Sequence, residues 1–172
     1  MANWARGAAL ATGMALFSMP ALAFDPWFFT TETDQDGTEY GFAQTATIDG
    51  NAWLFAECAP GEAPILALFL DASAGTIASL DAEKTSLTLT NGGGAEVSGV
   101  ATYRKAGEGL LGITMDDETV FAPALALFSE AQWHVSAGVA PSRADLPGTI
   151  RFPARGSSEA VAGLRAFCNS LE

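Results

Sequence analysis

Four carboxylates near the start of the chain are spaced closely enough to bind a metal ion. Three of them alternate along the chain, a glycine follows the third, and the fourth comes shortly afterwards: Glu32, Asp34, Asp36 and Glu39. Oxygen ligands of this kind are what Ca²⁺ prefers. In an EF-hand loop that begins at Glu32, however, Ala43 occupies the position that requires a bidentate acid. The pattern favours a solvated acidic loop between two strands, and an irregular calcium site is the alternative.

A second group of acidic residues and the single histidine could support catalysis. Asp116, Asp117 and Glu118 could supply a general acid and a general base if their pKa values differed. Three adjacent acids just before a helix are more typical of a charged, capping surface. His134 would need a positioned nucleophile, and the chain contains neither Gly-x-Ser-x-Gly nor His-Glu-x-x-His. We therefore predict no catalytic residue and no enzyme activity, with an acidic-residue hydrolase as the alternative.

The overall charge disfavours anionic partners. The chain has eight Lys and Arg residues against twenty Asp and Glu residues, a net charge of −12. Such a surface repels a nucleic-acid backbone and an anionic membrane surface. Three consecutive glycines at 92–94 could suggest a phosphate-binding loop, but they lack the lysine and the following helix of a P-loop. We expect a turn there, no nucleic-acid partner and no cofactor.

The first 23 residues have the three parts of a secretory signal peptide. Arg6 precedes an apolar run over 7–19, and Ala21-Leu22-Ala23 follows with small residues at its first and third positions, which places the expected cleavage between Ala23 and Phe24. The apolar run is shorter than the roughly 20 residues that a membrane-spanning helix needs. We predict a periplasmic or secreted protein, with one β-rich domain over 24–172 and no membrane span after cleavage.

Export changes the interpretation of the two cysteines, Cys58 and Cys168. In an oxidising compartment an isolated pair more often forms a structural disulfide than a metal or catalytic site. A zinc site would need more Cys or His ligands than this chain offers. We therefore predict one disulfide between Cys58 and Cys168.

The chain alternates short apolar segments with turn residues, which predicts a mainly β fold. Asp49-Gly50 is a strong hairpin signal, and Ser157 or Ser158 is suited to cap a C-terminal amphipathic helix. A short helix is expected near 123–132, with Pro123 at its first position. The predicted strands are 27–31, 40–48, 52–58, 65–70, 85–90, 96–104, 110–115, 133–137 and 149–152. We expect an antiparallel β-sandwich or curled sheet closed by the terminal helix, with 65–70 as a central strand covered on both faces.

Eight aromatic residues concentrate in the early strands. They are Trp27, Phe28, Phe29, Tyr40, Phe42, Trp53, Phe55 and Phe69. Most of them should lie in the core, but strand side chains alternate between faces, so not all can point inward. We expect those that do not to form a patch that binds a partner.

One C-terminal pattern suggests a family. Phe152-x3-Gly156-x3-Ala160-x3-Leu164-x3-Cys168, with an earlier strand that ends at Cys58, resembles small exported proteins of the invasion-associated locus B type. The resemblance implies a non-enzymatic periplasmic protein with a virulence-associated or envelope role, and it supplies no catalytic residues. We predict an exported binding or envelope-accessory protein with a protein partner in the envelope, and a calcium or small-ligand carrier as a further alternative.

Overall fold

A computed structural model describes residues 27–115 and 117–171. The predicted signal peptide and its cleavage site between Ala23 and Phe24 lie outside these residues. Nine strands and three helices follow one another in this order: β1 (Trp27–Thr33), β2 (Glu39–Ala46), β3 (Ala52–Cys58), β4 (Ile65–Asp71), α1 (Ala74–Leu80), β5 (Lys84–Asn91), β6 (Glu96–Gly107), β7 (Leu110–Met115), α2 (Glu118–Ser129), β8 (His134–Ala140), β9 (Thr149–Pro153) and α3 (Ser157–Ser170). Within the described ranges, no helix has the length and apolarity needed to cross a membrane.

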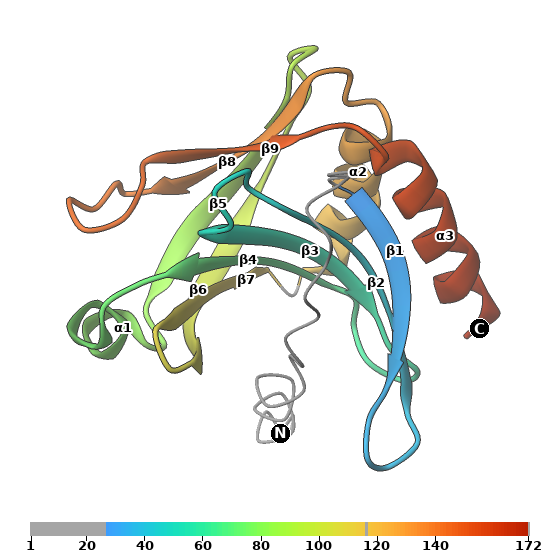
Figure 1. The fold of residues 1–172 in the computed structure, drawn as a ribbon, viewed down its shortest axis with the longest axis horizontal. Helices are drawn as coiled ribbons and strands as arrows, with labels where there is room; N and C mark the ends of the chain where they lie inside the picture. The colour runs from blue at the N-terminus through green and yellow to red at the C-terminus, as the bar shows by residue number, and fades with distance from the viewer. Residues whose placement is uncertain (1–26, 116, 172) are drawn as a thin grey trace.

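All nine strands belong to a single antiparallel sheet, as Figure 1 shows. Their order is β1-β2-β3-β4-β7-β6-β5-β8-β9. The expectation of a mainly β fold is confirmed, and of the two expected forms the structure has the curled sheet. Most neighbours in the sheet are also neighbours in the sequence, so tight turns such as the one at Asp49-Gly50 connect them.

The curl of the sheet brings its two edges together at one end. The backbone N–H of Trp27 in β1 donates to the carbonyl of Arg155, 3.2 Å away, and the Trp27 indole N–H donates to the carbonyl of Pro153 at 2.7 Å. Among the residues that the structure describes, β1 and β9 form no ladder, so the sheet is open. The two hydrogen bonds instead join the edges at a single point.

The core lies on one face of the sheet, which we call the core face. Along β3, β4 and β7, alternate residues such as Leu54, Leu68 and Ile113 are directly opposite one another and are fully buried. Helices α2 and α3 pack on this face. Trp27 contacts Phe128 of α2 with ring centroids 4.9 Å apart. Strand alternation therefore separates a core face from an outward face across the whole sheet.

Helix α2 begins earlier than expected. The sequence predicts a start at Pro123, but the helix spans Glu118–Ser129 with Pro123 inside it. Asp117 caps the helix, because its side chain accepts a hydrogen bond from the Thr119 N–H at 2.9 Å. Proline removes one helical hydrogen bond. Burial of apolar residues on both sides of it, among them Phe121 and Phe128, offsets that loss.

The start of α3 also differs from the prediction. Gly156 is the N-cap, and neither Ser157 nor Ser158 provides a side-chain cap. Gly156 has a φ of 83°, and a Cβ atom there would lie 2.8 Å from the carbonyl oxygen of Trp27. The contact with β1 thus requires glycine at this position. Ser158 instead donates to the carbonyl of Ser129 in α2 at 2.6 Å and so links the two helices.

A short helix, α1, is absent from the prediction. Its N-cap is Ser73, whose hydroxyl accepts from the Thr76 N–H at 3.1 Å. Only Ile77 and Leu80 of this helix are buried, which is too few apolar positions to produce a clear helical period in the sequence. The two buried side chains belong to the same core as the sheet and α2.

The predicted disulfide is present. Cys58 at the end of β3 and Cys168 in α3 are joined, with their Cα atoms 5.6 Å apart. The apolar stripe expected on α3 is also present, since Ala160, Val161 and Leu164 are buried against the sheet. The disulfide and the stripe together fix α3 across the first three strands.

Candidate functional site

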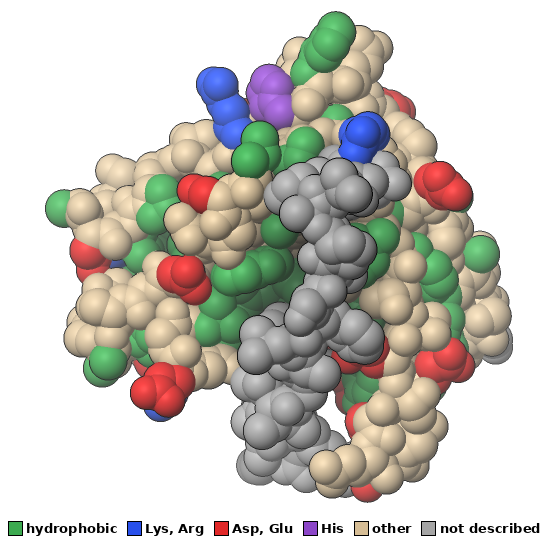
Figure 2. Space-filling view, in the orientation of Figure 1, with side chains coloured by type: hydrophobic (Ala, Val, Ile, Leu, Met, Phe, Trp, Pro, Cys, Tyr) green, Lys and Arg blue, Asp and Glu red, His purple; other side chains and the backbone are tan. Residues whose placement is uncertain are grey.

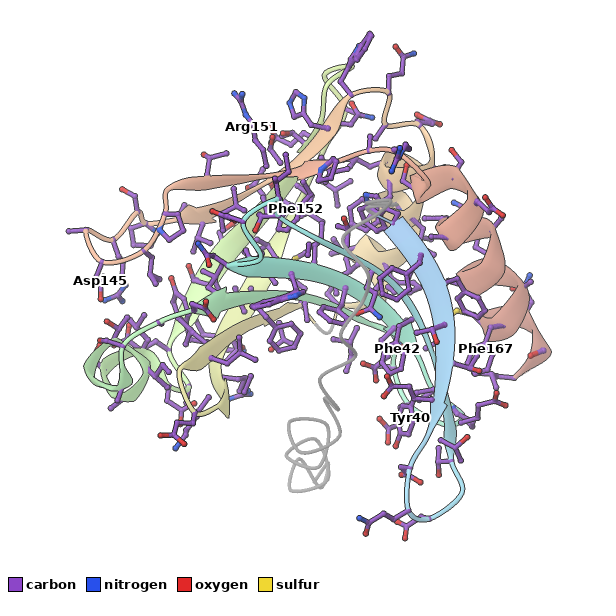
Figure 3. All side chains as sticks on the ribbon, in the orientation of Figure 1. Tyr40, Phe42, Asp145, Arg151, Phe152 and Phe167 are labelled. Atoms are coloured by element: carbon purple, nitrogen blue, oxygen red, sulfur yellow. A yellow bond between two sulfur atoms is a disulfide. The ribbon has the colours of Figure 1, made fainter. Side chains whose placement is uncertain are left out.

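Six aromatic residues lie on the outward face of β1 to β4. Opposed residues in neighbouring strands share a face, so the register places them together. Phe28 and Phe55 lie opposite Gln44, Phe42 lies opposite Thr30, and Trp53 lies opposite Phe69. We call the set the aromatic face: Phe28, Tyr40, Phe42, Trp53, Phe55 and Phe69. Figure 3 shows Phe42 and Phe167 on opposite sides of the β1–β2 ribbon, which separates this face from the side covered by α3.

This arrangement corrects the expectation that most early aromatics are core residues. Of the eight, only Trp27 and Phe29 lie on the core face. Phe42 is buried on the outward face, Phe28 is 42% exposed, and the others are half-buried. The physical reason is that α2 and α3 bring their own aromatic side chains, such as Phe128 and Phe167, and these fill the core.

Four of the six aromatic rings form two contacting pairs. Phe55 and Phe69 meet edge to face with centroids 5.1 Å apart, and Tyr40 stacks on Phe42 at 6.4 Å. Figure 2 shows hydrophobic side chains gathered near the centre of this view, over β3 and β4, with acidic side chains around them. Large apolar surfaces of this kind on a strand face are typical of binding sites.

Glu57 is a half-buried acidic residue within this surface. It follows Phe55 on the same face of β3 and lies opposite Phe42 and Ile65 in the flanking strands. Burial raises the pKa of its carboxyl to about 7, and the negative charges of Glu62 and Glu32 raise it further in the same direction. Glu57 is not among the residues predicted from the sequence, although a lone acid in the apolar run 52–58 was the available signal.

Of the four candidate calcium ligands, Asp34 has a structural role in the β1–β2 hairpin. Asp34 Oδ1 accepts hydrogen bonds from the backbone N–H groups of Asp36 and Thr38, and Oδ2 accepts from the Tyr40 hydroxyl at 3.1 Å. Burial, this hydrogen bond and nearby carboxylates raise the pKa of Tyr40. Over 27–115 and 117–171, no three His, Cys, Asp or Glu side chains are grouped to hold a metal ion. Asp34 thus organises the turn expected between the two strands.

Two residues of the second acidic cluster, Asp117 and Glu118, lie at the start of helix α2. Asp117 caps α2 through hydrogen bonds to the N–H and hydroxyl of Thr119, which lower the pKa of its carboxyl. Glu118 occupies the first turn of the helix and is exposed. Asp116 lies outside the described residues. The expected capping surface is confirmed for Asp117.

His134 and the glycines at 92–94 also have structural positions. His134 begins β8, is half-buried and lies opposite Pro153. The glycines form the β5–β6 turn, where Asn91 Oδ1 accepts hydrogen bonds from the N–H groups of Gly93 and Ala95, each at 3.0 Å. The turn expected from the three glycines is therefore confirmed, and it requires φ of 89° at Gly94.

Two open cavities lie away from the aromatic face. One, of about 530 Å³, lies beside the disulfide, where Glu62 from the β3–β4 loop and Arg165 from α3 line it. The other, of about 790 Å³, lies between the β2–β3 turn and β9, where Asp49 and Arg151 line it. Charged residues of both signs line each cavity: two line the first, and three line the second, where Asp71 is the third. The aromatic face differs from both cavities in the number of aromatic side chains that the strand register brings together.

No protein-family model, no curated protein and no solved structure matches this chain. A function must therefore be inferred from the residues and their geometry.

Proposed function

We propose that the protein is a non-catalytic, exported binding or envelope-accessory protein whose partner occupies the aromatic face. The single observation that carries the proposal is the position of six aromatic side chains on a sheet face opposite α2 and α3. The parts of these rings that remain exposed to water cost free energy that a partner recovers by covering them. Aromatic residues are also the side chains most enriched at the centres of protein interfaces.

Two further observations support export and the accessory role. The Cys58–Cys168 disulfide is compatible with an oxidising compartment such as the periplasm. The signal-peptide pattern of residues 1–23 and the C-terminal resemblance to exported proteins of the invasion-associated locus B type point to the same compartment. Detection of an epitope-tagged protein in periplasmic and cytoplasmic fractions tests the predicted location. The mass of the exported form tests the predicted cleavage before Phe24.

The binding function is tested by changing the face while leaving the core unchanged. Trp53→Ser with Phe69→Ser removes two opposed aromatic side chains in neighbouring strands. The matched control is Trp133→Ser, because Trp133 is 76% exposed and lies outside the aromatic face. Circular dichroism establishes that each variant is folded.

The measurement is capture from a periplasmic extract followed by binding assays with the purified captured protein. We expect a partner that binds the wild type and the Trp133→Ser variant but loses at least tenfold in affinity for the double variant. A partner that binds all three proteins equally would exclude the aromatic face as the binding surface.

A further inference from the structure

The aromatic face is wider than a small ligand needs. It extends over β1 to β4, which is three strand spacings or about 14 Å. Along β3 it extends from Trp53 to Glu57, four residues or about 13 Å. A surface of these dimensions can accommodate several residues of a peptide.

Aromatic rings lie toward one end of the face, where Asp71 follows Phe69 as the next outward position of β4, and a pair of acidic side chains lies toward the other end. Trp53 and Phe69 lie opposite each other at one end, with Phe55 beside them. Glu32 and Glu57 lie at the other end, next to Tyr40 and Phe42. All of these residues occupy outward positions in their strands, so their side chains are directed to the same side of the sheet.

The acidic end has no positive partner among the described residues. No salt bridge to Glu57 or Glu32 occurs within 27–115 and 117–171. Arg104 of β6 also lies on the outward face. The strand pairing puts it in line with Gly112, Phe69 and Trp53, at the other end of the face from the acidic pair. The high pKa of Glu57 agrees with this, because a nearby cation would lower it.

We propose that the aromatic face binds a cationic, amphipathic peptide segment, a proposal that rests on the binding function described above. Lysine or arginine side chains of the segment lie beside Glu32 and Glu57, where the half-buried Tyr40 ring adds a cation–π attraction. Apolar side chains of the segment cover Trp53, Phe55 and Phe69. The net charge of −12 attracts such a partner over longer distances.

The test measures binding of two fluorescently labelled peptides by anisotropy at low salt. In one peptide lysine and leucine alternate, and in the other glutamate replaces each lysine. The proteins are the wild type, Glu32→Gln/Glu57→Gln, and the control Glu118→Gln/Glu159→Gln. The control removes the same two charges from exposed positions in the first turns of α2 and α3. A fourth protein, Trp53→Ser/Phe69→Ser, tests whether peptide binding requires the aromatic rings at the apolar end.

We expect the lysine peptide to bind the wild type and the helix control alike, and to bind Glu32→Gln/Glu57→Gln at least tenfold more weakly. The glutamate peptide should show no binding. Equal weakening by both charge variants would mean general attraction to an acidic protein and would overturn the proposal.

Other results separate this proposal from the binding function itself. If both peptides bind the wild type equally and both are lost in Trp53→Ser/Phe69→Ser, the face binds partners without selecting cations, so only the present proposal fails. If the lysine peptide binds the wild type and Trp53→Ser/Phe69→Ser equally, the aromatic face is not the peptide site and the proposal also fails. If neither peptide binds the wild type, the proposal of a cationic peptide is overturned, while a partner captured through Trp53 and Phe69 would still support the binding function.

Discussion

The ionised carboxylate of Glu57 destabilises the folded protein, because it is partly buried. Its carboxyl lies among half-buried apolar side chains, opposite Phe42 and Ile65, and faces the charges of Glu32 and Glu62. A neutral residue there would fold more favourably, because an ionised group loses hydration on burial. Retaining an acid at such a position is consistent with a binding role for the carboxylate.

The first prediction concerns the pH dependence caused by Glu57. An ordinary glutamate has a pKa of 4.5, whereas Glu57 in the folded protein has a pKa of about 7. Between these values the folded protein keeps a proton that the unfolded chain has released, so the free energy of unfolding falls as pH rises. Glu57→Gln should melt several degrees above the wild type at pH 8 and close to it at pH 4, as measured by thermal denaturation.

The control for this prediction is Glu159→Gln, an exposed acid in α3. It should leave the difference in melting temperature between pH 4 and pH 8 unchanged. Tyr40, Glu32 and Glu62 are the titratable groups that face Glu57, and all three remain in the Glu57→Gln variant. A wild type whose stability rose between pH 5 and pH 7 through Glu57 would contradict the predicted sign.

Two glycines set how closely α3 approaches the sheet. A Cβ atom at Gly41 in β2 would collide with the Phe167 ring, and one at Gly163 in α3 would lie 2.7 Å from Cγ of Phe29. The missing side chains allow each ring to lie directly on the opposing backbone. Small residues at these two positions are therefore a packing requirement and not a sign of flexibility.

The second prediction is that Gly41→Ala destabilises the protein by about 1 to 3 kcal/mol, the range typical of overpacked cores. The cause is displacement of Phe167 and, with it, of α3. Urea denaturation measures the free energy of unfolding. Gly148→Ala is the control, because no atom lies within 4 Å of the added Cβ there and Gly148 is exposed. Equal stability of the two variants would show that α3 does not need the close approach.

At the scale of elements, the disulfide connects the third strand to the last helix. Cys58 and Cys168 are separated by 110 residues, so their bond restricts most of the unfolded chain. It also acts at the outer end of α3, where Phe167 and Cys168 are only partly buried. The inner turns of the helix, which contain Ala160 and Leu164, are held by apolar packing instead.

The third prediction is that Cys58→Ser with Cys168→Ser lowers the free energy of unfolding by up to roughly 4 to 5 kcal/mol, from the loop-closure entropy of a loop this long. Replacing both cysteines avoids leaving a free thiol. Guanidinium denaturation under oxidising conditions measures the change. The reduced wild type is the matched control and should resemble the double variant. Identical denaturation curves for the oxidised wild type and the double variant would contradict the prediction.

Helix α2 illustrates how packing overrides a local signal. Pro123 favours the first position of a helix, yet it lies five residues after the start at Glu118. The Asp117 cap stabilises the earlier start, and Val120 and Phe121, which lie before the proline, are buried. Starting the helix at Pro123 would remove these two side chains from the packed helical face.

At the scale of the whole molecule, Trp27 joins the two ends of the sheet. Its backbone and indole N–H groups donate to carbonyls at and just after the end of β9, and its ring packs on Phe128 of α2. It is separated from Pro153 by 126 residues. One side chain thus connects the first strand, the last strand and the helix in the core.

The fourth prediction is that Trp27→Phe destabilises the protein by about 1 to 3 kcal/mol, because it removes the indole hydrogen bond to Pro153 and part of a buried ring. Amide hydrogen exchange should become faster in β1 and β9 together. Trp133→Phe serves as the control, since Trp133 is 76% exposed and its change should stay within about 0.5 kcal/mol. Faster exchange in β1 alone would show that the edges are not coupled through Trp27.

Much of the fold was predictable from local patterns. Every predicted strand has a counterpart in the sheet, because alternation and turn residues such as Asp49-Gly50 act over a few neighbouring positions. The disulfide was predictable because only two cysteines exist. The site was predictable in part: leftover aromatics were expected on an outward face, but neither their identity nor Glu57 followed from the sequence.

The sequence by itself determined the mainly β architecture, the C-terminal helix and the pairing of Cys58 with Cys168. Only the tertiary structure decided which face of each strand is the core. Alternation divides a strand into two faces without specifying which one the helices cover, and β3 has large apolar residues on both. The packing of α2 and α3 resolves that choice, because it covers Leu54 and leaves Trp53, Phe55 and Glu57 on the outward face.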